Sequence, residues 1–317
     1  MRKIIGIGET LLDIVFRQGS VVASQPAGST LNAITTLALC GHTTVMLSQT
    51  SSDVVGDHIL QAMRDNGIDT RFVQTATGSK TPIALAILDK EDNANYTFYR
   101  DTPNSDRNTD ADLCTPLPDI MEDDIVICGS YYAIDPSTHS RVMHILQHAR
   151  ERGAIVYYDI NYRPSHKQER DKLMPNIERL LSLADVVRGS ADDFLTLADC
   201  VCPDTAFSTI VAPHAPNLIF TAGKKPTTVF APGIVRRDYP TPPVSTVSTI
   251  GAGDNFNAGI IHAIVRQGIT RRQLHSGLAP SLWDTIVSTA QQFAANSCTH
   301  IGNNVTTDFA NNQRQQQ

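Results

Sequence analysis

The stretch "STIGAGDNFNAGIIHAIVRQG", residues 248–268, places two glycines and an aspartate directly before an apolar helical pattern. The apolar residues that recur at the spacing of one helix face are Phe256, Ile260, Ala263 and Ile264. The pattern predicts a helix that begins near Gly253 and ends before Gly268. The unpaired amides of its first turn and the helix dipole favour an anion, and the glycines allow phosphate oxygens to approach the backbone closely.

Asp254 follows these glycines, and two interpretations of its carboxylate stay open from this stretch alone. It can accept a proton from a hydroxyl group that attacks phosphorus, which is the role of a base in phosphoryl transfer. It can also act as a polar residue of the first turn that stabilises the helix, by about 0.5 to 2 kcal/mol. The remainder of the chain has to decide between the two.

Elsewhere, apolar strand-like runs alternate with amphipathic helical segments. The runs are "KIIGIG", "TTVMLSQ", "DIVICGS", "AIVYYDIN", "ADVVRGS" and "NLIFTAG". This alternation predicts an α/β fold with a parallel sheet covered by helices on both faces. A doubly wound sheet fits better than a barrel, because "TTVFAPGIVRRDYP" has the pattern of an antiparallel pair and the strand-helix units are irregular in length.

Two segments interrupt this alternation, at about 13–27 and 82–105. The second alternates on both sides of an Asp- and Asn-rich turn, which is typical of a hairpin. Because open sheets bind ligands beyond the carboxyl ends of their strands, such an extra hairpin predicts a lid, with a surface insertion as the alternative. We therefore expect a single domain over 1–317 that carries lid segments, and a frayed Asn- and Gln-rich tail over 311–317.

The composition favours a small-molecule partner. The chain has 317 residues, 41% of them hydrophobic and 18% charged, and a net charge of -6 that argues against nucleic acid as a partner. No apolar run is long enough to span a bilayer, so we expect no membrane and a cytoplasmic location. The six cysteines lack the paired spacing of a zinc site, and we interpret them as reduced thiols.

The opening stretch resembles the C-terminal signature of the PfkB, or ribokinase-like, carbohydrate kinases, and "AGSTLNAITTLALCG", residues 27–41, is similar to their N-terminal signature. "GIGETLLD", "DINYRP", "RGSADDF" and "FTAGKK" follow the family's order over essentially the whole chain. "GIGETL" does not match a dinucleotide fingerprint, because Leu11 stands where the third glycine belongs. The resemblance implies a ribokinase-like three-layer α/β/α sandwich with a mainly parallel sheet and a small β lid.

The resemblance also implies roles for single residues. Asp254 would be the base that deprotonates a sugar hydroxyl. The amides of Gly251, Ala252 and Gly253 would stabilise the transferred phosphoryl group. The residues implied on the sugar side are Asp13, Gly28, Asn32, Arg100, Asp159, Asn161 and Arg163. Those implied on the nucleotide side are Ser190, Asp193, Thr221, Gly223 and Asn296, with Asp193 acting on the metal indirectly through water.

Two positions depart from the family's pattern. Ser248 stands where the signature usually has an aspartate linked to a monovalent-cation site, which makes a requirement for that cation doubtful. Pro226 replaces a usual glycine after "TAG" and predicts a reshaped nucleotide loop. Neither change affects Asp254 or the glycines beside it.

The resemblance therefore implies a kinase that uses ATP and Mg²⁺ to phosphorylate a primary hydroxyl of a monosaccharide. "GETLLD", "FYRD" and "DINYRP" favour fructokinase, which makes fructose 6-phosphate from D-fructose, over 2-keto-3-deoxygluconate kinase, ribokinase and nucleoside kinase. A sugar-binding protein that has lost the reaction remains as an alternative from another class. A homodimer stays open.

Overall fold

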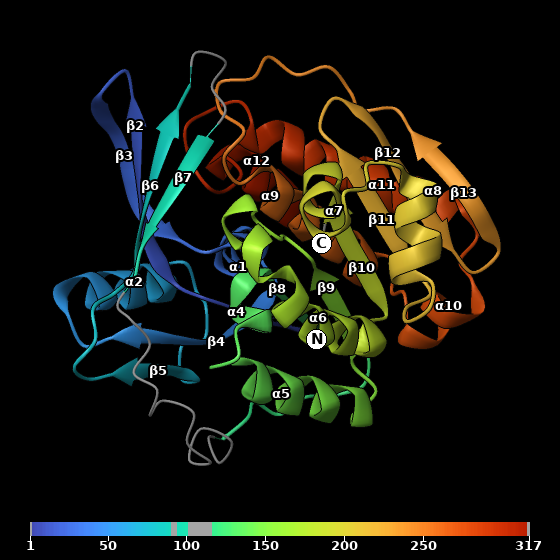
Figure 1. Ribbon diagram of the computed structural model, residues 1–317, viewed down its shortest axis with the longest axis horizontal. Helices are drawn as coiled ribbons and strands as arrows, with labels where there is room; N and C mark the ends of the chain where they lie inside the picture. The colour runs from blue at the N-terminus through green and yellow to red at the C-terminus, as the bar shows by residue number, and fades with distance from the viewer. Residues whose placement is uncertain (1, 90–93, 101–115, 316–317) are drawn as a thin grey trace.

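The computed structural model describes residues 2–89, 94–100 and 116–315, and these form two β-sheets and the helices around them (Figure 1). Residues 90–93 and 101–105 of the second predicted lid segment, and Cys114, lie outside the described residues.

The larger sheet has nine strands in the order β13-β12-β11-β10-β9-β8-β1-β4-β5. All neighbours from β5 to β11 run parallel, whereas β12 is antiparallel to β11 and to β13, so the predicted late antiparallel pair is confirmed. The strands are β1 (Lys3–Ile7), β4 (Thr43–Ser51), β5 (Val73–Ala76), β8 (Ile125–Gly129), β9 (Ile155–Asp159), β10 (Val186–Ser190), β11 (Leu218–Ala222), β12 (Lys225–Ala231) and β13 (Ile234–Tyr239).

Helices cover both faces of this sheet. One face packs against α1 (Ser29–Leu39), α2 (Val54–Asp65), α9 (Ala252–Arg266), α10 (Arg271–Ser276), α11 (Pro280–Ser297) and α12 (Thr307–Gln315). The other packs against α4 (Ser130–Ile134), α5 (His139–Glu151), α6 (Arg170–Leu183), α7 (Ala191–Ala198) and the π-helical turn Ala206–Val211. The short helices Pro164–Glu169 and α8 (Pro203–Thr205) join these elements.

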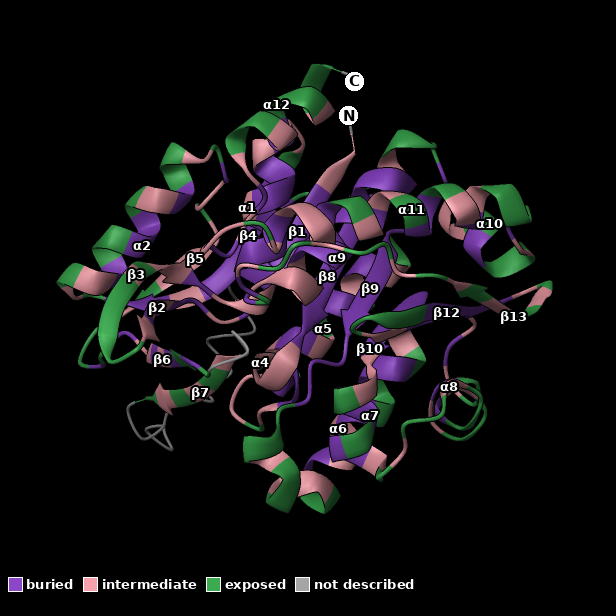
Figure 2. Cartoon of the chain, turned by 90° about the horizontal axis from the view of Figure 1, so that it is seen from above, coloured by how far each residue is buried: buried purple, intermediate pink, exposed green. Residues whose placement is uncertain are grey.

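Strand β9 shows why the sequence pattern gives this three-layer arrangement. Ile155 and Tyr157 belong to one core, Val156 and Tyr158 to the other, and all four side chains are fully buried. A strand that is buried on both faces has to be apolar at every position, as this run is. Figure 2 shows the buried strands inside the molecule, with exposed residues on the outer helices.

The smaller sheet has four strands in the order β3-β2-β6-β7 and lies to one side of the large sheet, where α2 contacts β2 and β3 (Figure 1). Its strands are β2 (Leu11–Arg17), β3 (Ser20–Ala27), β6 (Ile83–Leu88) and β7 (Ala94–Tyr99). Both predicted lid segments contribute to it, and β6 and β7 pair as the expected antiparallel hairpin. We call this four-stranded sheet the lid. Among the described residues, the apolar clusters that pack on this sheet are small, such as that of Val15, Ala86, Leu88 and Ile250.

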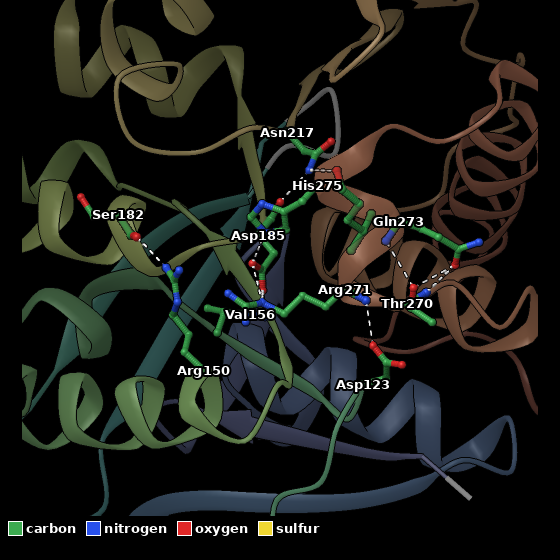
Figure 3. Close-up of polar contacts among 11 residues, drawn as sticks. Asp123, Arg150, Val156, Ser182, Asp185, Asn217, Thr270, Arg271, Gln273 and His275 are labelled. Atoms are coloured by element: carbon green, nitrogen blue, oxygen red, sulfur yellow. Dashed lines mark hydrogen bonds and ion pairs between the residues drawn. The ribbon is translucent and has the colours of Figure 1, made fainter.

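The amino edge of the large sheet is held by a buried carboxylate, Asp185 (Figure 3). Its Oδ2 accepts the amide of Val156 at 2.8 Å, and its Oδ1 lies 3.0 Å from Nε of Arg271 and 2.6 Å from Nε2 of His275. Asn217 donates to the main-chain oxygen of Asp185. This carboxylate therefore links α10 to β9 and β10. Because it lies at the amino ends of the strands, it leaves the opposite edge of the sheet, at their carboxyl ends, free for a ligand.

The C-terminal tail differs from our expectation. Helix α12 continues to Gln315, because Arg314 donates to the carbonyls of Leu39 and Ala38 at the end of α1 and so fixes the last turn. Among the described residues, no single helix is both long and apolar enough to cross a membrane, although the bent pair Ala191–Ala198 and Pro203–Val211, at 63°, passes on length and composition.

We predict that Asp185→Ala lowers the free energy of unfolding by about 3 kcal/mol, because it leaves the Arg271 guanidinium without its buried partner. Urea unfolding at pH 7 measures this change. Asp199→Asn is the control, since the Asp199 side chain is 61% exposed and its ion pairs with Lys167 and Arg170 are open to water. Equal urea midpoints for the Asp185 variant and the wild type would contradict the prediction.

Candidate active site

The N-terminus of α9 is the centre of the candidate site. Gly251 precedes the helix with φ of 72°, and a Cβ atom there would lie 2.7 Å from the carbonyl oxygen of Asn303, so this turn requires glycine. The amide of Ala252 donates to the Thr249 carbonyl at 3.2 Å. Within the described part of the chain, the amides of Gly251 and Gly253 have no acceptor and remain available to an anion.

Asp254 lies in the first turn of α9. Its Oδ2 accepts a hydrogen bond of 2.7 Å from the side-chain Nδ2 of Asn32 on α1. The surrounding protein removes water from this carboxyl and raises its pKa to about 7. The Asn32 hydrogen bond and the guanidinium groups of Arg163 and Arg188 oppose that shift, whereas the carboxylate of Asp159 adds to it. A carboxyl group with such a pKa can take up a proton near neutral pH.

Two pockets lie on either side of the start of α9. Asp254 faces the smaller one, which lies under the lid and has a volume of about 80 Å³. The predicted residues in its lining are Asp13, Gly28, Asn32, Arg100, Asn161, Arg163 and Asp254. It is also lined by residues that sequence reasoning missed, namely Glu9, Leu11, Ser29, Tyr96, Phe98, Ser130, Tyr131 and His166. Leu11, Tyr96 and Phe98 lie on lid strands and Glu9 in the loop after β1, whereas Ser29, Ser130, Tyr131 and His166 lie in helices, and none of them stood out by residue type.

Two carboxylates of the smaller pocket differ in their surroundings. Asp13 is buried and accepts a hydrogen bond of 3.2 Å from Asn303, and the loss of water raises its pKa to about 6. Glu9 instead forms a bidentate pair with Arg100, whose Nε and Nη2 atoms donate at 2.8 and 2.6 Å. The Arg100 guanidinium also lies 4.6 Å from the ring centre of Phe98, so the pair joins the lid to the loop after β1.

The larger pocket has a volume of about 580 Å³ and lies on the other side of the α9 N-terminus. Its polar lining includes the predicted Ser190, Thr221, Gly223, Ala252 and Gly253. Its apolar lining is formed by Pro242, Pro243, Val244, Phe256, Ala294 and Ala295. Apolar walls with a few polar groups at one end are typical of a pocket for a large, partly aromatic ligand. Gly253 and Asp254, which are consecutive, therefore face different pockets.

Asp193 is engaged in a capping box at the start of α7. Its Oδ2 accepts from the amide and the hydroxyl of Ser190, both at 2.7 Å, and its own amide donates to the Ser190 hydroxyl. Among the described residues, no group of three or more His, Cys, Asp or Glu side chains could hold a metal ion. The donor set fits only a metal ion that takes most of its ligands from phosphates and water, as Mg²⁺ commonly does.

Several residues named from the sequence lie outside both pocket linings. Asp159 is buried beneath them, where Arg188 and Asn257 bind its oxygens at 3.0 and 2.8 Å. Asn296 forms two hydrogen bonds with Thr306 instead of entering the larger pocket. Gly251 is also absent from both linings, although its amide has no acceptor among the described residues.

The two departures from the family's pattern also lie outside the linings. Ser248 is fully buried, and its hydroxyl accepts the amide of Ile250 at 3.2 Å. Pro226 is exposed on β12 beside the pocket residues Lys224 and Thr227.

Arg188 in the larger pocket is the main residue that sequence reasoning missed. The available signal was a charged residue inside the otherwise apolar strand run "ADVVRGS". Taken together, the arrangement can bind a polyhydroxylated molecule among carboxylates and amides in one pocket. It can also bind an anion at the free amides of α9, beside a carboxyl that accepts protons.

Comparisons with known proteins identify the family and the fold of this chain. The model of the pfkB family of carbohydrate kinases matches residues 1–307. Fructokinase-1 of Oryza sativa subsp. japonica is 26% identical over 272 residues, which cover 83% of each chain. The 5-dehydro-2-deoxygluconokinase of Geobacillus thermodenitrificans is 26% identical over 249 residues, or 75% of this chain and 72% of that protein.

Solved structures of sugar kinases share the fold. Aminoimidazole riboside kinase from Salmonella enterica, complexed with aminoimidazole riboside and an ATP analogue, superimposes with a TM-score of 0.81 at 22% identity, covering 98% of this chain and 99% of that one. A fructokinase double mutant from Vibrio cholerae O395, bound to fructose, ADP and potassium, gives 0.80 at 20% identity, covering 96% and 94%. The predicted ribokinase-like fold is confirmed, and the chain belongs to the pfkB family of carbohydrate kinases.

Proposed function

We propose that this protein is an ATP-dependent sugar kinase that transfers the γ-phosphoryl group to a primary hydroxyl of a monosaccharide, with D-fructose as the first candidate. One observation carries the proposal: the free amide of Gly253 faces the larger pocket, while the carboxyl of the next residue, Asp254, faces the smaller one. A phosphoryl acceptor and a phosphoryl donor bound in these pockets would meet at the start of α9.

In this mechanism the acceptor hydroxyl oxygen forms a bond to the γ-phosphorus of ATP, and the bond from that phosphorus to the bridging oxygen breaks. ADP leaves with the electron pair of the broken bond, and Asp254 takes the hydroxyl proton. The amides of Gly251 and Gly253 bind the developing negative charge. Mg²⁺, brought in by the nucleotide, supplies further neutralisation of the phosphate charge.

The polar residues of the smaller pocket support a polyol as the acceptor. Asp13 and Asn32 provide hydrogen-bond partners for hydroxyl groups, and Arg163 places a cation near the phosphoryl acceptor. We place the reaction in the cytoplasm, where ATP is abundant.

The first test measures ADP release from MgATP with fructose, tagatose, ribose, 2-keto-3-deoxygluconate, 5-dehydro-2-deoxygluconate and adenosine. We expect the highest kcat/KM with fructose, and a loss of at least about 10² in kcat for Asp254→Asn, which lacks the base. Turnover with another sugar alone would reassign the substrate. A folded protein that is protected against heat by a sugar but shows no turnover would contradict the kinase proposal and favour the sugar-binding alternative.

We predict that Asp254→Asn is more thermostable than the wild type at pH 8. Folding raises the pKa of this carboxyl from 3.8 to about 7, so its contribution to stability is lost as the pH rises from about 4 to 7. A neutral amide avoids that loss, and we expect a Tm increase of about 2 to 6 °C that shrinks at pH 4. The control is Asp65→Asn, an exposed position on α2. A lower Tm for Asp254→Asn at pH 8 would contradict the prediction.

Asn32→Ala tests the electrostatic coupling between α1 and the proposed base. It removes a hydrogen bond that favours the ionised form of Asp254, so the pKa of Asp254 should increase. Because the base acts when deprotonated, the acidic limb of kcat/KM should shift to higher pH by about one unit. Thr36→Ser on the same helix, which retains its hydroxyl and leaves Asn32 in place, should not shift the limb. An unchanged limb in Asn32→Ala would refute the coupling.

A further inference from the structure

Arg188 is a buried cation in the middle of the large sheet. Its side chain is 9% exposed, and it extends from β10 between residues of β9 and β11. Nη1 donates to Oδ1 of Asp159 at 3.0 Å, and Nη2 donates to Oγ1 of Thr221 at 2.7 Å. Nε is buried and has no hydrogen-bond partner among the described residues. A guanidinium group has five N–H donors, so this one is incompletely satisfied.

The guanidinium lies directly under the first turn of α9. A methyl group added to Gly253 would be 3.2 Å from Nη2 and 3.3 Å from Nη1 of Arg188, closer than such groups normally pack. Arg188 also lines the larger pocket together with Ser190, Thr221 and Gly253. The charged group is thus located where this pocket meets the free amides of the helix.

The charges around Arg188 are mostly negative. Asp159 forms an ion pair with it, and Asp193 and Asp254 lie close enough to interact with it electrostatically. A guanidinium loses much hydration when it is buried, and one carboxylate at 3.0 Å with one hydroxyl only partly replaces that hydration. A phosphate group bound at the adjacent amides would supply the oxygens that the remaining N–H groups lack.

We propose that Arg188 is the cationic part of the anion site, and that it contacts the γ-phosphoryl group of the nucleotide from beneath α9. The inference rests on the proposed function and deepens it. As the bond between the γ-phosphorus and the bridging oxygen breaks and the acceptor oxygen bonds to that phosphorus, negative charge on the transferred group lies between the guanidinium and the amides of Gly251 and Gly253. The guanidinium keeps its protons throughout, and Asp254 takes the proton of the acceptor.

A purely structural role for Arg188 makes a different prediction. If the guanidinium only joined β9, β10 and β11 through Asp159 and Thr221, its replacement would lower the Tm. The folded fraction would then bind nucleotide and turn over substrate normally. Measurements on folded protein therefore separate the two roles.

Arg188→Lys is the first variant, because it keeps the charge beside Asp159 but removes the planar donor fork. Calorimetric titrations with MgATP and with MgADP, in the absence of sugar, give the binding readout. We expect ATP to bind about tenfold more weakly and ADP to change by less than about threefold, since only ATP carries the γ-phosphate. We also expect kcat to fall by about 10².

A second pair of variants removes the charge of Arg188 without leaving the buried Asp159 carboxylate unpaired. Asp159→Asn keeps the guanidinium without its carboxylate, and the double variant Arg188→Met with Asp159→Asn removes both members of the ion pair, so the comparison between them isolates the guanidinium. We expect the double variant to have kcat about 10² to 10³ lower than Asp159→Asn, and an acidic limb of kcat/KM at higher pH, because a cation near Asp254 is lost.

Unchanged ATP and ADP affinities in Arg188→Lys, or equal losses for both, would overturn the assignment to the γ-phosphoryl group. So would a double variant that keeps kcat and the acidic limb of Asp159→Asn. The nucleotide affinities are measured without an acceptor. They therefore decide the role of Arg188 even if no sugar is phosphorylated, which would instead refute the proposed function.

Discussion

The position of α9 is the constraint on which the site depends. This helix lies between α1 and α11, and a Cβ atom on Gly259 would be 2.5 Å from the Cα atom of Ala290, so the backbones of α9 and α11 are in close contact. On the other side, Asn255 accepts from the hydroxyl of Thr36 and donates to the carbonyls of Gly251 and Asn303. These contacts fix where the free amides and Asp254 stand relative to both pockets.

The same packing makes the site electrostatically unfavourable in the absence of ligands. Asp13 and Asp254 each lose hydration, which raises their pKa values to about 6 and about 7. Asp159 is buried as well, and its pKa also increases despite its ion pair with Arg188. A protein selected for stability alone would not gather these carboxylates, and their persistence at one edge of the sheet is typical of a site where stability is given up for function.

The sequence predicted the elements better than the contacts between them. Helical spacing located α9 and its glycines. The resemblance named Asp254 as the base and Asn32 as a sugar-side residue, and the hydrogen bond of 2.7 Å between them was found only in the structure. The sequence could not show how deeply each polar side chain is buried. Asp159 is the last residue of β9, two residues before Asn161. It lies beneath the pockets and binds Arg188, because the parallel register places β9 and β10 side by side at these two residues. Asn296 was named from its place in the chain, whereas its partner Thr306 depends on the path of a loop.

The two sheets differ in how much apolar surface holds them. The large sheet lies between two extensive cores, while the lid relies on small clusters around Val15 and Leu11 and on polar links such as the pair between Glu9 and Arg100. Local opening requires less free energy where fewer apolar contacts are broken. The amide protons of β2 and β6 should therefore exchange with solvent through partial unfolding events that leave the strands beneath α9 protected.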